Sequence, residues 1–326
     1  MKDLYSAHGK DRMFINSVTG PVDTAALGPT LVHEHVGGAD WSLRMNGGSR
    51  FFDYDTVVSA AVAAFAKVKQ ECGITTVVDG TPINMGRDVE LVRDVARRTG
   101  ITFIVSSGFY YQEEPSLANS SVDDIYDFLL TECQHGVGDT GIMPGIMKAA
   151  VGTAGVTPYL TKMLTAIARV AATTGLPVFC HHDVNARSGG DILDIFEHEG
   201  VPLDRFILGH SGDTDDLSYL EPLLTRGCNI GMDRFAYDDV MLGLQPRVDT
   251  IAALWRQGYA DQMMLSHDLV AYRGRLVTRD NASRPEPHDL TYIQTTVFPA
   301  LEKAGVPRED LVHMITDNPR RLFETV

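Results

Sequence analysis

Strand-length apolar runs alternate along this chain with longer segments whose apolar residues recur at helical spacing. In segment 55–72, for example, Val58, Val62 and Phe65 recur along one helical face, and segment 159–174 has the same character. Strands that alternate with helices pair in parallel, and eight such units favour a closed (β/α)8 TIM barrel. The expected strands are residues 30–34, 75–79, 102–108, 145–149, 177–181, 206–210, 229–232 and 263–266.

The length of 326 residues fits one such barrel, which needs roughly 250 residues plus insertions, or two average domains. No linker rich in proline, glycine or serine separates two halves, so we expect a single domain over residues 1–326. It should carry a short hairpin at about 13–28 and closing helices at about 290–326. A doubly wound sheet is the alternative, but such sheets usually carry a glycine-rich phosphate loop after the first strand. Here the first strand ends in His-Glu-His instead.

Composition and charge exclude several classes of partner. The formal net charge is -15, from 43 acidic and 28 basic residues, so the surface would repel phosphate backbones and anionic membranes. We therefore expect no nucleic-acid partner and no membrane partner. The four cysteines are scattered without a CxxC pair, which favours a reducing cytoplasm over a disulfide framework. Without a signal-like apolar region or a run near ~18 apolar residues, we expect neither export nor membrane insertion.

Residues with metal-binding side chains stand at the ends of the expected strands. His33 and His35 share one face of the first strand, because side chains alternate along a strand. Such a pair either chelates a metal or packs in a core. The carboxyl ends of barrel strands converge on one face, where catalytic groups gather. We therefore expect the two histidines to meet the side chains at four other strand ends, namely Lys148, His181, His210 and Asp268.

Lys148 lies inside the apolar run GIMKAAVG and needs an explanation of its own. A protonated amine cannot bind a metal, and burying an unpaired charge is costly. A neutral lysine can instead react with carbon dioxide, and the resulting carbamate has two oxygens that can bridge two metals. The alternative is that Lys148 pairs with an acidic side chain.

Several segments together resemble the phosphotriesterase family of the amidohydrolase superfamily, and the pattern is closest to the phosphotriesterase-like lactonases. The resemblance covers nearly the whole chain, in order and at suitable spacing, and its most specific parts are HEH and GHSGDTDD. The ending DNPRRLF is similar to the closing helix of that family. The other matching segments are LGPTLVHEHV, GIMKAAVGT, LPVFCHH, FEHEGVP, RFILGHSGDTDDLSYL and SHD.

The resemblance implies two divalent metal ions, with zinc expected and cobalt, manganese or iron also accepted by such sites. His33, His35 and Asp268 would hold the more buried ion, and His181 and His210 the more exposed one. Carboxylated Lys148 and a hydroxide would bridge the two ions and supply the nucleophile, and Asp268 would also transfer the proton. The family register prefers His181 over His182, which should point away from the pocket. Family members are often homodimers, so a homodimer is expected here.

Two local features favour a lactone as the small-molecule substrate. Tyr110 in SSGFYY matches a tyrosine that lactonases of the family carry beside the metals, and Arg234 in GMDRF matches their GxDR motif. These side chains could orient the ester of the lactone ring. They could instead be a packing residue at the rim and a structural partner of Asp233 or another acid.

Other functions remain open from the sequence alone. The same centre could hydrolyse a phosphotriester or organophosphate, or an N-acyl amide, and an inactive barrel that binds a small molecule is the alternative outside catalysis. Three aspartates that follow His210 are expected to fix loop geometry and cap a helix: Asp213, Asp215 and Asp216. Three arginines of loop eight could bind an anionic substrate or lie in solvent: Arg273, Arg275 and Arg279.

Overall fold

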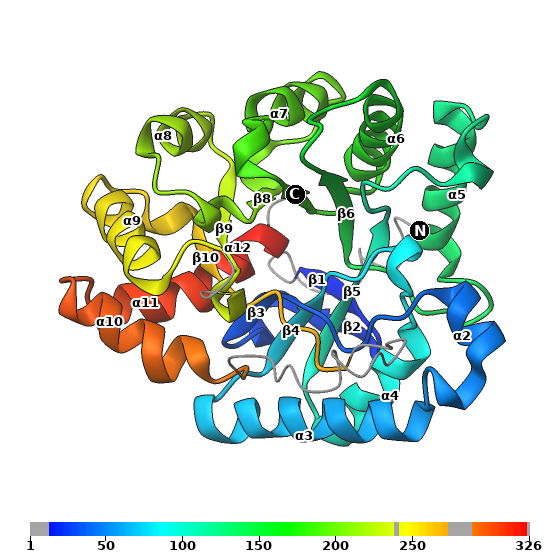
Figure 1. Cartoon of the computed structure of the whole chain (residues 1–326), viewed down its shortest axis with the longest axis horizontal. Helices are drawn as coiled ribbons and strands as arrows, with labels where there is room; N and C mark the ends of the chain where they lie inside the picture. The colour runs from blue at the N-terminus through cyan, green and yellow to red at the C-terminus, as the bar shows by residue number, and fades with distance from the viewer. Residues whose placement is uncertain (1–12, 238–240, 273–288, 325–326) are drawn as a thin grey trace.

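The computed structural model describes residues 13–237, 241–272 and 289–324 and contains an eight-stranded parallel sheet curled into a nearly closed barrel (Figure 1). The predicted TIM-barrel class is confirmed, because the strands follow one another around the sheet in chain order. The strands are β3 (Thr30–Glu34), β4 (Thr76–Asp79), β5 (Thr102–Gly108), β6 (Ile146–Val151), β7 (Val178–His182), β8 (Phe206–Gly209), β9 (Asn229–Met232) and β10 (Met263–Leu265).

A ring of helices surrounds these strands (Figure 1). The longest, α3, begins where the Asp53 carboxylate accepts a hydrogen bond from Thr56 N and ends at left-handed Gly73. Within the described ranges, no helix has the length and apolar character of a membrane span. The helices are α2 (Trp41–Gly47), α3 (Tyr54–Cys72), α4 (Val89–Thr99), α5 (Val122–His135), α6 (Pro158–Thr174), α7 (Gly189–His198), α8 (Leu217–Thr225), α9 (Leu244–Arg256), α10 (Phe298–Lys303), α11 (Arg308–Ile315) and α12 (Asp317–Glu324).

The barrel interior is filled by apolar side chains at its amino-terminal end. An antiparallel hairpin of β1 (Phe14–Ser17) and β2 (Gly20–Asp23) and the last helix, α12, pack against this interior cluster. Because this end is filled, the cavity described below lies at the carboxyl end of the barrel. The inward-facing cluster consists of Val32, Val78, Ile104, Ile146, Phe179, Ile207 and Met264 from the strands, together with Ile15, Leu27, Leu322 and Phe323.

Closure between the first and last barrel strands depends on the segment that follows β10. Asp268 N donates to His33 O at 3.0 Å, and His35 N donates to Leu269 O at 2.8 Å. The carboxylate of Glu34, which has no exposed surface, accepts hydrogen bonds from Ser266 Oγ, His267 N and Leu269 N. Glu34 therefore fastens the turn that carries Asp268 to β3.

We predict that Glu34→Gln lowers the free energy of unfolding by roughly 2–4 kcal/mol, because an amide N–H would face backbone donors in a buried site. Urea unfolding followed by circular dichroism measures this. The exposed Glu71→Gln is the matched control and should change stability by less than about 0.5 kcal/mol. Equal stability of the two variants would show that Glu34 does not fasten the barrel.

Candidate metal centre

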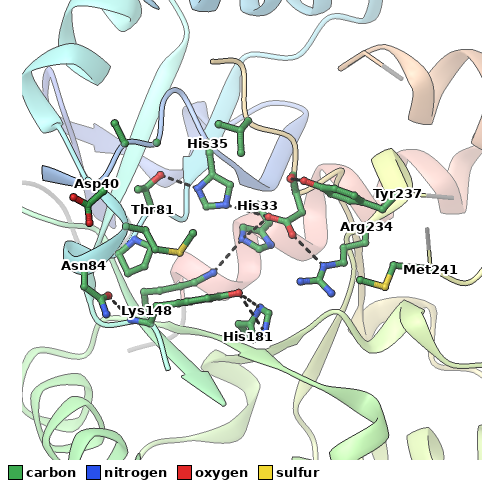
Figure 2. Close-up of a pocket in the computed structure, with 17 residues that line it drawn as sticks. His33, His35, Asp40, Thr81, Asn84, Lys148, His181, Arg234, Tyr237 and Met241 are labelled. Atoms are coloured by element: carbon green, nitrogen blue, oxygen red, sulfur yellow. Dashed lines mark hydrogen bonds and ion pairs between the residues drawn. The ribbon is translucent and has the colours of Figure 1, made fainter. Parts of the chain in front are cut away.

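The carboxyl ends of the barrel strands bring the candidate metal ligands together around one cavity of about 480 Å³. Figure 2 shows His33, Lys148 and His181 converging on it from three different strands. His210 lies just behind this wall at 1% exposure. The cavity is lined by His33, His35, Gly38, Ala39, Asp40, Thr81, Pro82, Asn84, Met85, Tyr110, Lys148, His181, Arg234, Tyr237, Met241, Asp268 and Val270.

A register shift in β3 turns both histidines of the His-Glu-His segment into the barrel. Val32 already faces the interior, so strict alternation would send Glu34 inward and His33 outward. The pairing of β3 with β4 shifts between Leu31 and Glu34, which moves His33 to the inner face. There the His33 ring packs on that of Phe179, with 4.2 Å between the ring centroids.

His210 reaches the site through a left-handed backbone conformation. Its φ is 65°, and β8 ends one residue earlier, at Gly209. A side chain on Gly209 would clash with the Phe179 ring, since a Cβ there would lie 2.3 Å from a ring carbon. Gly209, which faces the barrel interior, therefore has no side chain. The left-handed turn at His210 directs the His210 side chain toward the site instead.

Asp233 connects two of the histidines, a role that the sequence analysis did not assign to it. The buried carboxylate lies 2.8 Å from His33 Nδ1 and accepts a hydrogen bond of 2.6 Å from His210 N. Burial alone would raise the pKa of Asp233, but the charges and hydrogen bonds of His210 and His33 outweigh it and hold the pKa well below its usual range. The sequence held one signal for this role: Asp233 lies two residues after Gly231 of β9, so the two residues face the same side of the strand.

Asp268 is a second acidic group in the centre, and like His210 it has a left-handed backbone, with φ of 58°. Its Oδ1 lies 3.0 Å from His35 Nε2 and 3.4 Å from His33 Nε2. The other oxygen, Oδ2, accepts a hydrogen bond of 3.1 Å from Arg234 Nε. His35 is oriented from behind by Thr81, whose Oγ1 lies 2.7 Å from His35 Nδ1.

Lys148 is 1% exposed, and no carboxylate of the described residues lies within ion-pair distance of its Nζ. The pairing with an acid that the sequence left open is therefore not found. Nζ lies 3.0 Å from His33 Nε2 and 4.2 Å from the centroid of the Phe179 ring. Burial lowers the pKa of Lys148 to about 8, and burial with the Lys148 charge lowers that of His33 to about 3.

The two adjacent histidines of β7 face different ways. His181 lines the cavity, and its ring centroid is 4.4 Å from that of His210. His182 does not line the cavity, and its Nδ1 lies 2.7 Å from Gly209 O. Burial lowers the pKa of His181 well below its ordinary value, so the ring is neutral, as metal binding requires.

Tyr110 and Arg234 both line the cavity, and their contact with substrate stays a prediction. The Tyr110 hydroxyl lies 3.3 Å from His181 Nδ1, and burial raises the pKa of this phenol. Arg234 pairs with Asp213 at 2.8 Å and with Asp268, rather than with the neighbouring Asp233.

The remaining residues singled out in the sequence have mostly structural contacts. Asp213 also binds Arg247, at 2.7 Å. Asp216 is the N-cap residue of α8 but makes no capping hydrogen bond with its side chain, which pairs with Arg187 instead. No contact within the described ranges gives Asp215 a role. Arg273, Arg275 and Arg279 lie outside the described residues.

The donor set fits metal ions. Ligand atoms of His33, His35 and Asp268 lie within 4.8 Å of one another, as do those of His33, His210 and Asp233. Neither ring nitrogen of buried His210 makes a hydrogen bond within the described part of the chain, although Nδ1 lies 3.3 Å from Asp233 Oδ1. A buried imidazole without a partner is costly, and a cation would supply the partner that the protein does not.

We predict that His181→Asn lowers the metal content of the purified protein, whereas His182→Asn leaves it unchanged. The reason is that His181 faces the other ligands, while His182 faces a backbone carbonyl that an asparagine N–H can still reach. Inductively coupled plasma mass spectrometry of both variants and the parent protein tests this. Loss of metal from the His182 variant alone would reverse the assignment.

Comparison with known proteins identifies the family of the chain. The family model described as the phosphotriesterase family matches residues 13–323. The chain is 37% identical over 320 residues to the phosphotriesterase homology protein of Mycobacterium tuberculosis (strain CDC 1551 / Oshkosh), with 95% of this chain and 97% of that protein covered. It is 28% identical to the aryldialkylphosphatase of Saccharolobus solfataricus (strain ATCC 35092 / DSM 1617 / JCM 11322 / P2), covering 93% of this chain and 96% of that one.

A solved structure shows the same fold. It is the phosphotriesterase from Mycobacterium tuberculosis, with a TM-score of 0.89 and 36% sequence identity over 95% of this chain and 98% of that chain. The match to the family model, over residues 13–323, includes the hairpin, the barrel and most of the closing helices. This chain belongs to the phosphotriesterase family.

Proposed function

We propose that this protein is a metal-dependent hydrolase that opens lactone rings. The observation that carries the proposal is one cavity that unites a set of metal-binding side chains with the hydroxyl of Tyr110 and the guanidinium of Arg234. The ligand set would hold metal, and the two other groups would orient an ester at its edge. Membership of a family whose named relatives include an aryldialkylphosphatase supports the hydrolase class.

The proposed ligands divide into two groups. His33, His35 and Asp268 would hold one divalent cation, and His181 and His210 the other, with Lys148 between them. When bound, two such cations lower the pKa of a water molecule toward neutrality and polarise the C=O oxygen of the substrate. Zinc is the expected metal, and cobalt, manganese and iron suit the same donors.

Lys148 would join the ligand set as a carbamate. With a pKa lowered to about 8 by burial, part of the lysine is unprotonated near neutral pH. Its nitrogen can then form a bond to the carbon of CO2 and release a proton, which leaves a negatively charged carbamate with two oxygen donors. The short distance of 3.0 Å from Nζ to His33 Nε2 supports this position for a shared ligand.

Asp268 would move the proton. Its carboxylate is held on one side by His35 and on the other by Arg234, so Oδ2 keeps a fixed place at the cavity. As water attacks the ester carbon, Asp268 accepts the water's proton and delivers it to the ring oxygen that leaves. Burial by itself would lower the pKa of Arg234, but the charges of Asp268 and Asp213 have the larger effect and raise it. The guanidinium therefore stays positively charged.

Tyr110 would orient the ester. Its phenol is protonated near neutral pH, and burial raises the pKa further, so the hydroxyl can donate a hydrogen bond to a substrate oxygen. The hydroxyl is 3.3 Å from His181 Nδ1, so a substrate that contacts Tyr110 also lies beside the candidate metal ligands.

Phosphotriester hydrolysis is the second candidate, favoured by the name of the Saccharolobus relative. The same ligand set would serve a P=O substrate, and an N-acyl amide is a third possible class. The proposed substrate is a small molecule, and we propose a homodimer in the cytoplasm with neither nucleic acid nor membrane as partner.

Initial rates on acyl lactones, phosphorylated sugar lactones, paraoxon and N-acyl amino acids test the proposal. We expect lactones to give the highest kcat/KM, and Tyr110→Phe to lower that value by about 10- to 100-fold through loss of one oriented donor. Highest turnover of paraoxon or of an amide would replace the lactonase assignment. Metal uptake without turnover of any of these substrates would favour a binding barrel.

Chelation is expected to abolish turnover, and zinc, cobalt or manganese to restore it, because the water-activating cations would be lost and replaced. The assay compares dialysed and reconstituted protein on the best substrate of that panel. Full activity in protein shown to be free of metal would contradict the mechanism.

A further inference from the structure

Asn84 connects the loop that carries Tyr110 to the neighbouring loop. It lies in a 3-10 turn (Ile83–Met85) between β4 and α4 and lines the cavity. Its Oδ1 accepts a hydrogen bond of 2.7 Å from Tyr110 N, and its Nδ2 donates one of 3.0 Å to Glu114 Oε1. The two partners fix the orientation of the amide, because only the oxygen can face an N–H and only the nitrogen can face a carboxylate.

The turn that holds Asn84 is closely packed. Gly86 follows it with φ of 82°, and a Cβ there would lie 1.7 Å from Ala39 O. This close approach packs the turn against the segment after β3. Tyr110, by contrast, is the second residue of a long connection over residues 109–121 between β5 and α5. Asn84 therefore connects the start of this long loop to a short, packed turn.

The side chain of Tyr110 is held separately, by stacking. Its ring centroid is 4.3 Å from that of Tyr111 and 4.9 Å from that of His181. Tyr111 in turn packs on Gly152, where a Cβ would lie 3.0 Å from a ring carbon of Tyr111. These ring contacts restrict the orientation of the phenol ring. The distance from the Tyr110 hydroxyl to His181 also depends on where the Tyr110 backbone nitrogen is held.

We propose that Asn84 is a positioning residue that sets the Tyr110 hydroxyl at its distance from His181 by fixing the Tyr110 backbone. In Figure 2, Asn84 lies across the cavity from Arg234. Its Oδ1 accepts the hydrogen bond from Tyr110 N. The inference rests on the proposed function, in which the Tyr110 hydroxyl orients the substrate. Asn84 itself need not touch substrate, since its amide already has a partner on each side.

A double-mutant cycle tests whether Asn84 acts through Tyr110. We expect Asn84→Ala to lower kcat/KM on the best substrate by about 10-fold, because small displacements of an orienting group are costly. The loss in Asn84→Ala should be divided between a lower kcat and a higher KM in the same proportion as the loss in Tyr110→Phe. In the Tyr110→Phe background the same change should cost less than about 2-fold, since coupled residues are not additive. Equal losses in both backgrounds would overturn the proposal.

A second test exchanges the donor and the acceptor between residues 84 and 114 and asks whether activity recovers. Asn84→Asp keeps the acceptor for Tyr110 N but faces Glu114 with a second carboxylate, so we expect a loss of rate. Adding Glu114→Gln restores a donor and acceptor pair and should restore at least half of the parent rate. Failure of this double variant to recover, with the protein folded, would count against the proposal. Asn46→Ala, at an exposed asparagine of α2, is the control without effect.

Hydrogen exchange separates this inference from the proposed function, because it needs no turnover. The amide of Tyr110 should exchange faster in Asn84→Ala than in the parent protein, as measured on peptides spanning 109–117. The double variant that combines Asn84→Asp with Glu114→Gln should keep the protection of the parent. Unchanged protection in Asn84→Ala would overturn the positioning role even if lactones are hydrolysed. If the Tyr110 amide loses protection in Asn84→Ala but the parent protein does not hydrolyse lactones, the backbone contact is supported and the substrate assignment is rejected.

Discussion

The carboxyl end of this barrel buries ionisable side chains almost completely, and the rest of the site depends on how they find partners. His33, Lys148, His210 and Asp233 are all at most 2% exposed. Burying such groups is unfavourable unless each is neutral or paired. The protein meets this requirement in part: Asp233 is shared between two histidines, and Lys148 and His33 have lowered pKa values. Neither ring nitrogen of His210 makes a hydrogen bond within the described part of the chain, although Nδ1 lies near Asp233, and a cation would supply a partner.

Bringing these groups together also requires local departures from regular strand geometry. The shift in β3 turns His33 inward, and left-handed backbones at His210 and Asp268 redirect two further side chains. Such conformations cost of order 1–3 kcal/mol each and persist only where the surroundings hold them. Here Glu34 holds the Asp268 turn, Asp233 holds His210 N, and the apolar interior at the opposite end stabilises the barrel.

The sequence predicted the barrel and the strand ends because apolar runs and helical periods are local signals. It placed β3, β5 and β9 at their observed bounds and identified side chains that do meet at one cavity. Strand alternation, however, cannot predict the shift in β3 or the turn at His210, since both depend on neighbouring strands and on the Phe179 ring. The roles of Asp233 and Asn84 were missed for the same reason, because their partners are distant in sequence.

The most direct test of the central claim is a crystal structure of protein prepared with zinc, with anomalous maps collected at the zinc edge. We expect two peaks roughly 3.5–4 Å apart, as in other two-metal hydrolytic sites. One peak should lie among His33, His35 and Asp268 and the other beside His181 and His210, with carbamate density extending from Lys148 Nζ. A bare lysine amine and no anomalous peak at these side chains would contradict the account.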